Sequence, residues 1–314
     1  AIERWLTRVP GGLVVSNIGA CALFASMSGS SPATCAAIGK MGIPEMQKRG
    51  YPDEVAAGSI AAGGTLGILI PPSVTMIVYG IATATSIGRL FLAGLVPGIM
   101  LALIFMAWSI FATWRAGGAH IFTGRSYSLK ERLEILPRVI PFLVVVVLVL
   151  YAMYGGIATT SETAAVGAVA CLVMAVVIYK MWQPRAIWGV LRDSTRESIM
   201  ILFIMAAAGV FAYMMSSLFI TQALAEWIAG LEVNRWVLML IVNIFLLVAG
   251  FFLPPVAVIL MTAPVLLPIL QTADFDPYWF AVILTINLEI GLITPPVGLN
   301  LFVINSIAPQ ISLR

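Results

Sequence analysis

Residues 67–76 read GILIPPSVTM, and 224 residues later residues 291–300 read GLITPPVGLN. The shared register places Pro71-Pro72 on Pro295-Pro296 and continues upstream without a gap. Two adjacent prolines in an apolar run interrupt a helix, because each lacks an N–H and clashes with the preceding turn. Paired interruptions at equivalent points of two halves indicate the binding site of a membrane carrier.

The composition predicts an integral membrane protein. Of the 314 residues, 61% are hydrophobic and 10% are charged, whereas soluble domains carry about 25% charged residues. Several apolar runs are long enough to cross a hydrocarbon layer: 90–114, 139–154, 164–181 and 199–220. The chain has no basic cluster of the kind that binds nucleic acid.

The positive charges predict the topology. Thirteen of the 17 Lys and Arg residues fall in four segments, which the positive-inside tendency places in the cytoplasm: 4–8, 48–49, 115–138 and 180–196. Counting crossings from these segments puts the loop 268–278, which carries two Asp and no Lys or Arg, on the outer side. Its partner in the first copy, 44–54, carries Lys48 and Arg49. The two copies are therefore predicted to be inverted-topology repeats.

Two segments are too interrupted to span the membrane. Residues 12–43 break at Ser-Gly-Ser-Ser-Pro, 28–32, and residues 236–267 break at Leu-Pro-Pro, 253–255. Both are predicted to be re-entrant helical hairpins, whose tips meet the two proline breaks near the middle of the membrane. Residues 221–232 are expected to form an amphipathic helix on the outer surface.

The repeat register also predicts that this sequence is part of a longer protein. Residues 137–224 have no partner in the first copy, and the second copy stops before the equivalent of 90–114. We therefore expect N- and C-terminal segments to be absent from an all-α fold with two hairpins and two broken helices.

The breaks supply candidate ligands without formal charge. Half-helix ends expose unpaired N–H and C=O groups, which attract anions and cations respectively. Ser28, Ser30 and Ser31 add hydroxyls at the first tip, and Ser73 and Thr294 lie beside the two proline pairs. Such oxygen ligands suit Na⁺, and capping of buried helix ends is the alternative role.

Two carboxylates are predicted at membrane depth, where they are costly and usually functional. Glu162 follows a helix-start pattern, so capping and ion coupling both remain open for it. Glu289 precedes the second break, where it serves ion coupling, gating or packing. Cys21, Cys35 and Cys171 are read as small apolar residues, and His120 is the only histidine.

Five motifs resemble the large membrane subunit of tripartite ATP-independent periplasmic (TRAP) transporters: SGSSPATCAAIG (28–39), IPEMQKRGYP (43–52), AAGGTLGILIPPSVTMIVYG (61–80), GIATTSETAAVGA (156–168) and GLITPPVGLNLFV (291–303). Two positions depart from that pattern. Thr160 replaces a proline, and Leu253-Pro254 stands where the family often has Met-Asp. The role of that missing carboxylate is therefore not transferred to this chain.

The resemblance implies a Na⁺-driven secondary carrier of the bacterial inner membrane that needs no other cofactor. A periplasmic binding protein would deliver an organic acid, of the dicarboxylate or sialic acid class, and a small four-helix membrane subunit would brace the large one. An elevator mechanism would move a transport domain, 1–88 and 233–314, against scaffold or arm segments, 89–138 and 139–232.

The predicted ion- and substrate-binding residues lie at the tips, the breaks and the start of the helix after 159: Ser28, Gly29, Ser30, Ser31, Thr65, Gly67, Pro71, Pro72, Ser73, Thr160, Glu162, Leu253, Pro254, Gly291, Thr294, Pro295, Pro296 and Asn300. Na⁺ ligands are expected among five of them: Ser28, Ser31, Gly67, Gly291 and Thr294.

Three other readings compete with this one. A channel or purely structural membrane subunit seldom needs two hairpins that enter from opposite sides. An intramembrane enzyme would need paired Asp, a Ser with a His at depth, or HExxH, and the sequence has none of these. Another inverted-repeat carrier of citrate or other anions is the nearest rival.

Overall fold

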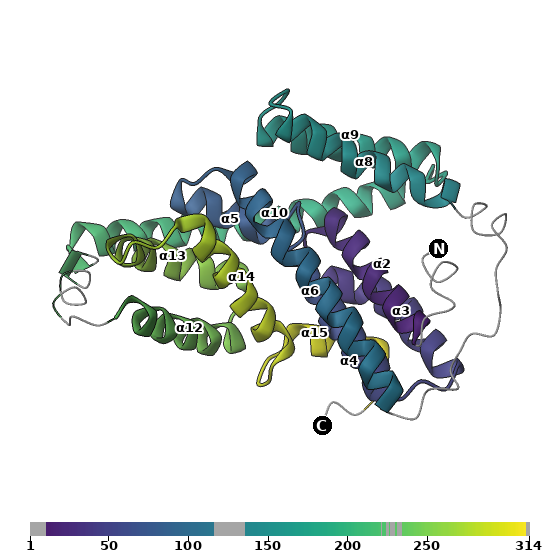
Figure 1. The fold of residues 1–314 in the computed structure, drawn as a ribbon. Coiled ribbons are helices and arrows are strands. Elements are labelled where there is room, and N and C mark those ends of the chain that lie inside the picture. Colours follow the sequence, from purple (N-terminus) through teal and green to yellow (C-terminus); the bar gives the residue numbers. More distant parts are fainter. Residues whose placement is uncertain are drawn as a thin grey trace.

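The computed structural model describes residues 11–115, 136–220, 222–223, 226, 230 and 234–311. All regular structure in these ranges is helical (Figure 1). Five of the described helices are long and apolar enough to cross a membrane: Ile87–Arg115, Thr160–Val177, Pro184–Ser217, Arg235–Phe252 and Pro255–Thr272. The predicted all-α membrane fold is confirmed at this level. His120 and most of the predicted surface helix 221–232 lie outside the described residues.

The first repeat is a helical hairpin followed by a broken helix. Helices α2 (Gly12–Ser28) and α3 (Ser31–Lys48) form the hairpin. Helix α4 (Asp53–Thr65) continues into the 3₁₀ turn η1 (Leu66–Ile68), and α5 (Val74–Thr83) begins after the proline pair.

The second repeat has the same elements in the same order. Helices α12 (Arg235–Phe252) and α13 (Pro255–Thr272) form its hairpin, and α14 (Pro277–Ile293) and α15 (Leu299–Ile307) its broken helix. Even the turn between hairpin and broken helix matches: the 224-residue shift places Gly50 on Asp274, and both have positive φ.

The hairpin helices are longer than the sequence predicted. Expected to end near residues 43 and 267, they continue to Lys48 and Thr272, so Pro44 and Pro268 lie inside α3 and α13. A proline deletes one hydrogen bond and strains the preceding turn, but the N–H groups after it still pair. One further helical turn can therefore follow each proline.

Four more helices lie between the two repeats, in the part of the chain predicted to supply arms and scaffold: α6 (Ile87–Arg115), α8 (Leu136–Tyr154), α9 (Thr160–Val177) and α10 (Pro184–Ser217). Helix α10 begins 15 residues before the expected start at residue 199. Pro184 is at its first position, where a missing N–H costs nothing. Its basic first half, for which the sequence predicted only a cytoplasmic location, is thus helical.

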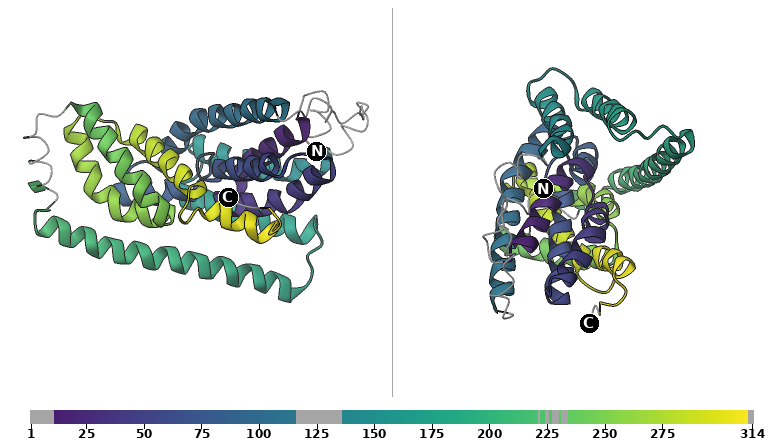
Figure 2. Two further views of the ribbon diagram at one scale, coloured as in Figure 1. Left: turned by 90° about the horizontal axis from the view of Figure 1, so that it is seen from below. Right: turned by 90° about the vertical axis from the view of Figure 1, so that its right-hand side faces the viewer.

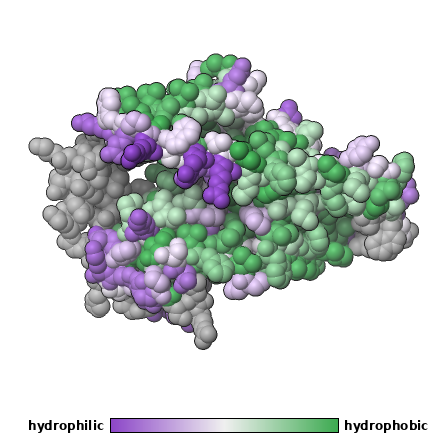
Figure 3. Space-filling view, turned by 180° about the vertical axis from the view of Figure 1, so that it is seen from behind, coloured by the Kyte–Doolittle hydropathy of each residue, from purple (hydrophilic) through white to green (hydrophobic). Residues whose placement is uncertain are grey.

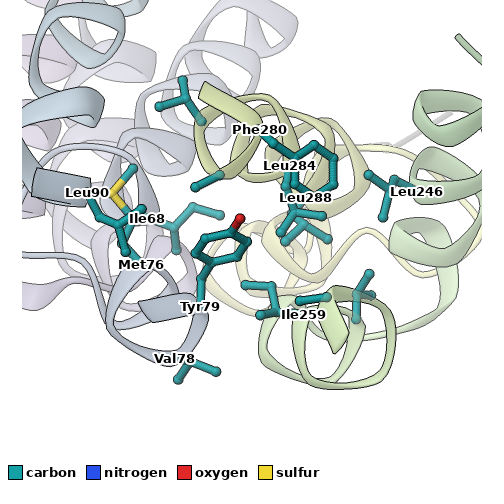
Figure 4. Close-up of a cluster of buried hydrophobic side chains, with 14 of the residues drawn as sticks. Ile68, Met76, Val78, Tyr79, Leu90, Leu246, Ile259, Phe280, Leu284 and Leu288 are labelled. Carbon is teal, nitrogen blue, oxygen red and sulfur yellow. The ribbon is translucent and has the colours of Figure 1, made fainter. Parts of the chain in front are cut away.

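The two repeats exchange the second halves of their broken helices. Helix α5 packs against α13 of the second hairpin, and α15 packs against α3 of the first. Tyr79 of α5 is buried in a cluster with Ile259 of α13 and Phe280 of α14 (Figure 4). Its hydroxyl donates to the carbonyl oxygen of Pro277 at 2.9 Å. Each hydrophobic core therefore contains side chains from both repeats.

Helices α8 and α9 lie outside these cores, whereas α10 contributes Ala208 to the core that contains Tyr79. Helix α9 packs on α8, and α10 runs along one edge of the molecule beside α13 (Figure 2). Ala208 is the one buried residue of α10 in the described chain, and the rest of the helix is exposed or half-buried. The surface seen in Figure 3 is accordingly largely hydrophobic. These faces fit contact with lipid or with another membrane subunit rather than with water.

Candidate functional site

The first half-site forms where the tip between α2 and α3 meets the break after α4. Gly29 ends α2 in the left-handed conformation, with φ 60°. Its carbonyl oxygen accepts a hydrogen bond from the N–H of Val74, with an N···O distance of 3.4 Å. A Cβ at Gly29 would lie 2.9 Å from the carbonyl oxygen of Pro72. Both the left-handed φ and this close approach therefore require glycine.

Hydroxyl groups hold the first tip closed. Ser28 Oγ lies 2.9 Å from Thr34 Oγ1, which donates to the carbonyl oxygen of Ser30 at 2.8 Å. Ser31 Oγ reaches across to α4 and donates to the carbonyl oxygen of Thr65 at 3.0 Å. Each hydroxyl that donates in this way keeps acceptor lone pairs. The tip can therefore hold its shape and still offer oxygen atoms to a cation.

Ser73 caps the helix that restarts after the first proline pair. It is fully buried; its Oγ donates to the carbonyl oxygen of Ile68 at 2.5 Å and accepts from the N–H of Met76 at 3.2 Å. A Cβ at Gly67 would lie 2.5 Å from the carbonyl oxygen of Ser30. The tip and the break are therefore in direct backbone contact.

The second half-site joins the tip between α12 and α13 to the break between α14 and α15. The N–H of Val297 donates to the carbonyl oxygen of Phe251 at 3.3 Å. A Cβ at Gly291 would lie 2.5 Å from the carbonyl oxygen of Gly250. The equivalent glycine of the first repeat instead contacts the start of α3, so Gly291 meets the other arm of its hairpin.

The second tip is more open than the first. Leu253 is 38% exposed and extended, with φ −116°, and Pro254 follows it. Pro295-Pro296 is exposed, whereas Pro71 of the first pair is buried; both Pro–Pro peptide bonds are cis. Helix α14 packs more extensively on α12 than on α13, whereas α4 packs closely on both arms of its hairpin.

A cavity of about 100 Å³ lies between the second tip and the second break. Gly250, Leu253, Gly291, Val297 and Gly298 are among its lining residues. A water occupies about 30 Å³ of liquid volume, so the space can hold a small cation with a few waters. Thr294, predicted as a ligand here, donates to the carbonyl oxygen of Ile290 at 2.6 Å and does not line this cavity.

Two buried polar side chains near the second break lack full hydrogen bonding within the described chain. Asn300 donates to the carbonyl oxygen of Ala61 at 3.4 Å, which links the two repeats, and its Oδ1 has no partner. Glu289 is 3% exposed, and its Oε1 has no partner. Asn300 thus lies beside α4 of the first repeat rather than in the second cavity.

Thr160 and Glu162 lie at the start of α9. Thr159 is the N-cap, and the Glu162 carboxylate accepts from its N–H and its Oγ1, both at 2.8 Å. This reciprocal pair is a capping box, and it accounts for the exposed Glu162 without an ion. Thr160 lines a separate, larger cavity together with Pro72.

Two polar groups were missed by sequence reasoning. Thr34 completes the hydroxyl cluster of the first tip, and its spacing of one helical turn from Ser30 and Ser31 was the available signal. Asn243 accepts from Nδ2 of Asn287 between α12 and α14. Among the described residues no cluster of His, Cys, Asp and Glu could hold a metal ion. Any cation here would depend on hydroxyl and carbonyl oxygens.

The architecture of paired tips and proline breaks can be compared with known families. The family model for the DctM component of the tripartite ATP-independent periplasmic transporter matches residues 2–313.

This chain belongs to the DctM family.

Its relatives include the C4-dicarboxylate TRAP transporter large permease protein DctM of Pseudomonas aeruginosa, 42% identical over 95% of this chain and 69% of that protein. The sialic acid TRAP transporter large permease protein SiaM of Vibrio cholerae is 31% identical, over 95% of this chain and 69% of that protein. The isethionate TRAP transporter permease protein DctMQ of Oleidesulfovibrio alaskensis is 36% identical, over 98% of this chain and 48% of that protein.

These matches confirm the resemblance found in the motifs. The chain is a multi-pass protein of the inner membrane and a large permease of the TRAP type, and its named relatives are permeases rather than enzymes. The relatives differ in substrate, from a C4-dicarboxylate to sialic acid and isethionate. Family membership alone therefore leaves the substrate of this chain open.

Proposed function

We propose that this chain is the large membrane subunit of a Na⁺-coupled secondary transporter that imports an organic acid of the dicarboxylate or sialic acid class. A periplasmic binding protein delivers the acid, and a small four-helix membrane subunit binds the large one. The observation that carries the proposal is the repeated pairing of a hairpin tip with a proline break, found in a DctM family member.

The two half-sites supply the chemistry that this function needs. Helix ends at the tips and breaks carry partial charges, so they can bind ions without a charged side chain. Na⁺ would be bound by the hydroxyls of Ser28 and Ser31 and the backbone near Gly67 in the first half-site. The backbone around Gly291 would bind it in the second, beside the small cavity. The organic acid would bind between the two.

The mechanism that we propose is an elevator. The repeats that exchange α5 and α15 would form one transport domain, 1–88 and 233–314, because their shared cores oppose separate movement. Segments 89–138 and 139–232 would supply scaffold and arm, and α6, which adds Leu90, Phe91 and Ala102 to the cores, would be an arm that moves with the repeats. Helices α8 and α9 support this division, since they contact the two cores little.

Reconstituted transport tests the coupling. Uptake into proteoliposomes should require an inward Na⁺ gradient, the small subunit and the matching binding protein. Uptake that continues unchanged with K⁺ in place of Na⁺ would refute the coupling. Ser28→Ala should lower uptake while barely changing the melting temperature, since Ser28 is half-buried at the tip. A thermal-shift panel of organic acids on the binding protein would identify the substrate.

Thiol labelling tests the inverted orientation. Lys48 and Thr272 are equivalent by the 224-residue shift and end α3 and α13. In a background carrying Cys171→Ser, Lys48→Cys should react with a membrane-impermeant reagent only from the cytoplasmic side. Thr272→Cys should react only from the periplasmic side. Labelling of both from one side would rule out inverted repeats.

A further inference from the structure

A second and larger cavity borders the first half-site, with which it shares Pro72. Its volume is about 490 Å³, and it separates the α8–α9 hairpin from the first repeat, which lies below that hairpin in Figure 1. Met27 and Pro72 line one wall, and Val149 and Gly167 line the opposite wall. Direct packing between the two units is sparse here, where α8 meets α2.

The walls of this cavity are apolar along most of its length. The side chains of Ile77, Ile81, Phe91, Val145 and Val149 all contribute, and no charged side chain is among the described lining residues. The hydroxyl groups in its lining are Ser26 of α2 and, at the start of α9, Thr160, Ser161 and Thr163. Thr163 is 2% exposed, and its Oγ1 has no hydrogen-bond partner within the described chain.

The chemistry of the lining decides which ligand fits. An organic acid would lose its hydration without gaining a counterion, which is costly in an apolar site. A transmembrane helix is about 10–12 Å wide and about 20 residues long, far larger than this space. An acyl chain is narrow and uncharged. Because α6 and α9 are long enough to span the membrane, the cavity also lies where acyl chains are abundant.

We propose that this cavity binds one acyl chain of a bilayer phospholipid. The polar end of the lipid lies near the Thr160–Thr163 turn, and the chain extends toward Val145 and Cys171. The acyl chain fills the gap between the α8–α9 hairpin and the first repeat. The two units therefore contact each other there through a flexible lipid chain instead of through interlocked side chains.

Photo-crosslinking in lipid nanodiscs tests the site. The full transporter is incorporated with phosphatidylethanolamine that carries a diazirine near the end of one acyl chain, irradiated and digested for mass spectrometry. Adducts are expected on the segments around Val145–Val149 and Ala168–Cys171, and excess organic acid should not reduce them. Crosslinking is measured without transport. The proposal of a lipid site can therefore be refuted while the proposed transport function holds, and the proposed function can be refuted while the lipid site holds.

Matched variants make the test decisive. Ala168 lines the cavity, whereas Ala165, on the same helix, does not and is exposed. Ala168→Phe should abolish the adducts, and Ala165→Phe should leave them unchanged, with equal melting temperatures. If Ala168→Phe does not fold, the smaller substitution Ala164→Leu replaces it, because Ala164 also lines the cavity. Equal adducts in both variants, competition by organic acid, or crosslinks to a polypeptide segment in the cavity would overturn the proposal.

Discussion

The two half-sites of this protein have the same topology but different packing. In the first, three hydroxyls bond to tip and helix oxygens, and α3 and α2 both pack on α4. In the second, the tip carries no hydroxyl, α13 packs on α14 less than α12 does, and a cavity of about 100 Å³ remains. One half-site is closed by side chains, whereas the other leaves room for a ligand.

The difference follows from two residues at each tip, Gly29-Ser30 in the first and the equivalent Leu253-Pro254 in the second. Gly29 can adopt a left-handed φ, which turns the chain back at once and lets Ser31 reach α4. The equivalent Leu253 precedes Pro254, and a residue before proline is restricted to extended conformations. The second hairpin therefore opens at its tip. Sequence differences of this kind can make two copies of one fold bind with different affinity.

The largest effect is expected from Gly29→Ala. A Cβ there would meet the Pro72 carbonyl at 2.9 Å and occupy a left-handed φ, and such backbone strain costs about 1–3 kcal/mol. Both the melting temperature and Na⁺-driven uptake should fall sharply. The matched variant Leu253→Ala, at an exposed and extended position, should change the melting temperature little. Equal losses in the two variants would mean that the tips are packed alike.

Ser73→Ala should have the next largest effect. It removes the N-cap of α5, which costs about 0.5–2 kcal/mol, and leaves the Ile68 carbonyl unpaired in a buried place. Thr294→Ala, in the half-buried second break, should destabilise less. Thermal unfolding of the two variants in the same detergent compares them. A greater loss for Thr294→Ala would contradict the packing described here.

Tyr79→Phe tests the contact between repeats. The substitution removes one hydrogen bond to the Pro277 carbonyl but keeps the ring against Phe280, so a loss of about 1 kcal/mol is expected. Tyr213→Phe on the exposed face of α10 serves as the control. An equal melting temperature for Tyr79→Phe and Tyr213→Phe would show that this hydrogen bond contributes nothing.

The smallest effect is expected from Glu162→Gln. The exposed carboxylate bonds only to Thr159 within the described chain, so its loss should loosen the start of α9 and leave the Na⁺ dependence of uptake unchanged. Uptake measured over a range of Na⁺ concentrations checks this. A clear shift in the Na⁺ concentration for half-maximal uptake would show that Glu162 takes part in Na⁺ coupling.

Much of the fold could be predicted because its signals are local. Paired prolines and Ser-Gly-Ser-Ser-Pro break helices wherever they occur, and the 224-residue register located every matched element. Helix ends beyond Pro44 and Pro268 could not be predicted, since the turn after a proline depends on packing. Thr34 could have been found from its spacing of one helical turn from Ser30 and Ser31. The open second tip depends on how two helices approach each other, which no single motif encodes.

The exchange of half-helices also constrains how the protein is made. The core around α2, α3 and α4 includes Ile304 and Ile311, more than 200 residues downstream. A chain emerging from the ribosome therefore cannot finish its first core until nearly all of the second repeat has been synthesised. Until then the first hairpin must wait in the membrane with an unfilled groove, a period when chaperones or the insertion machinery would have to shield it.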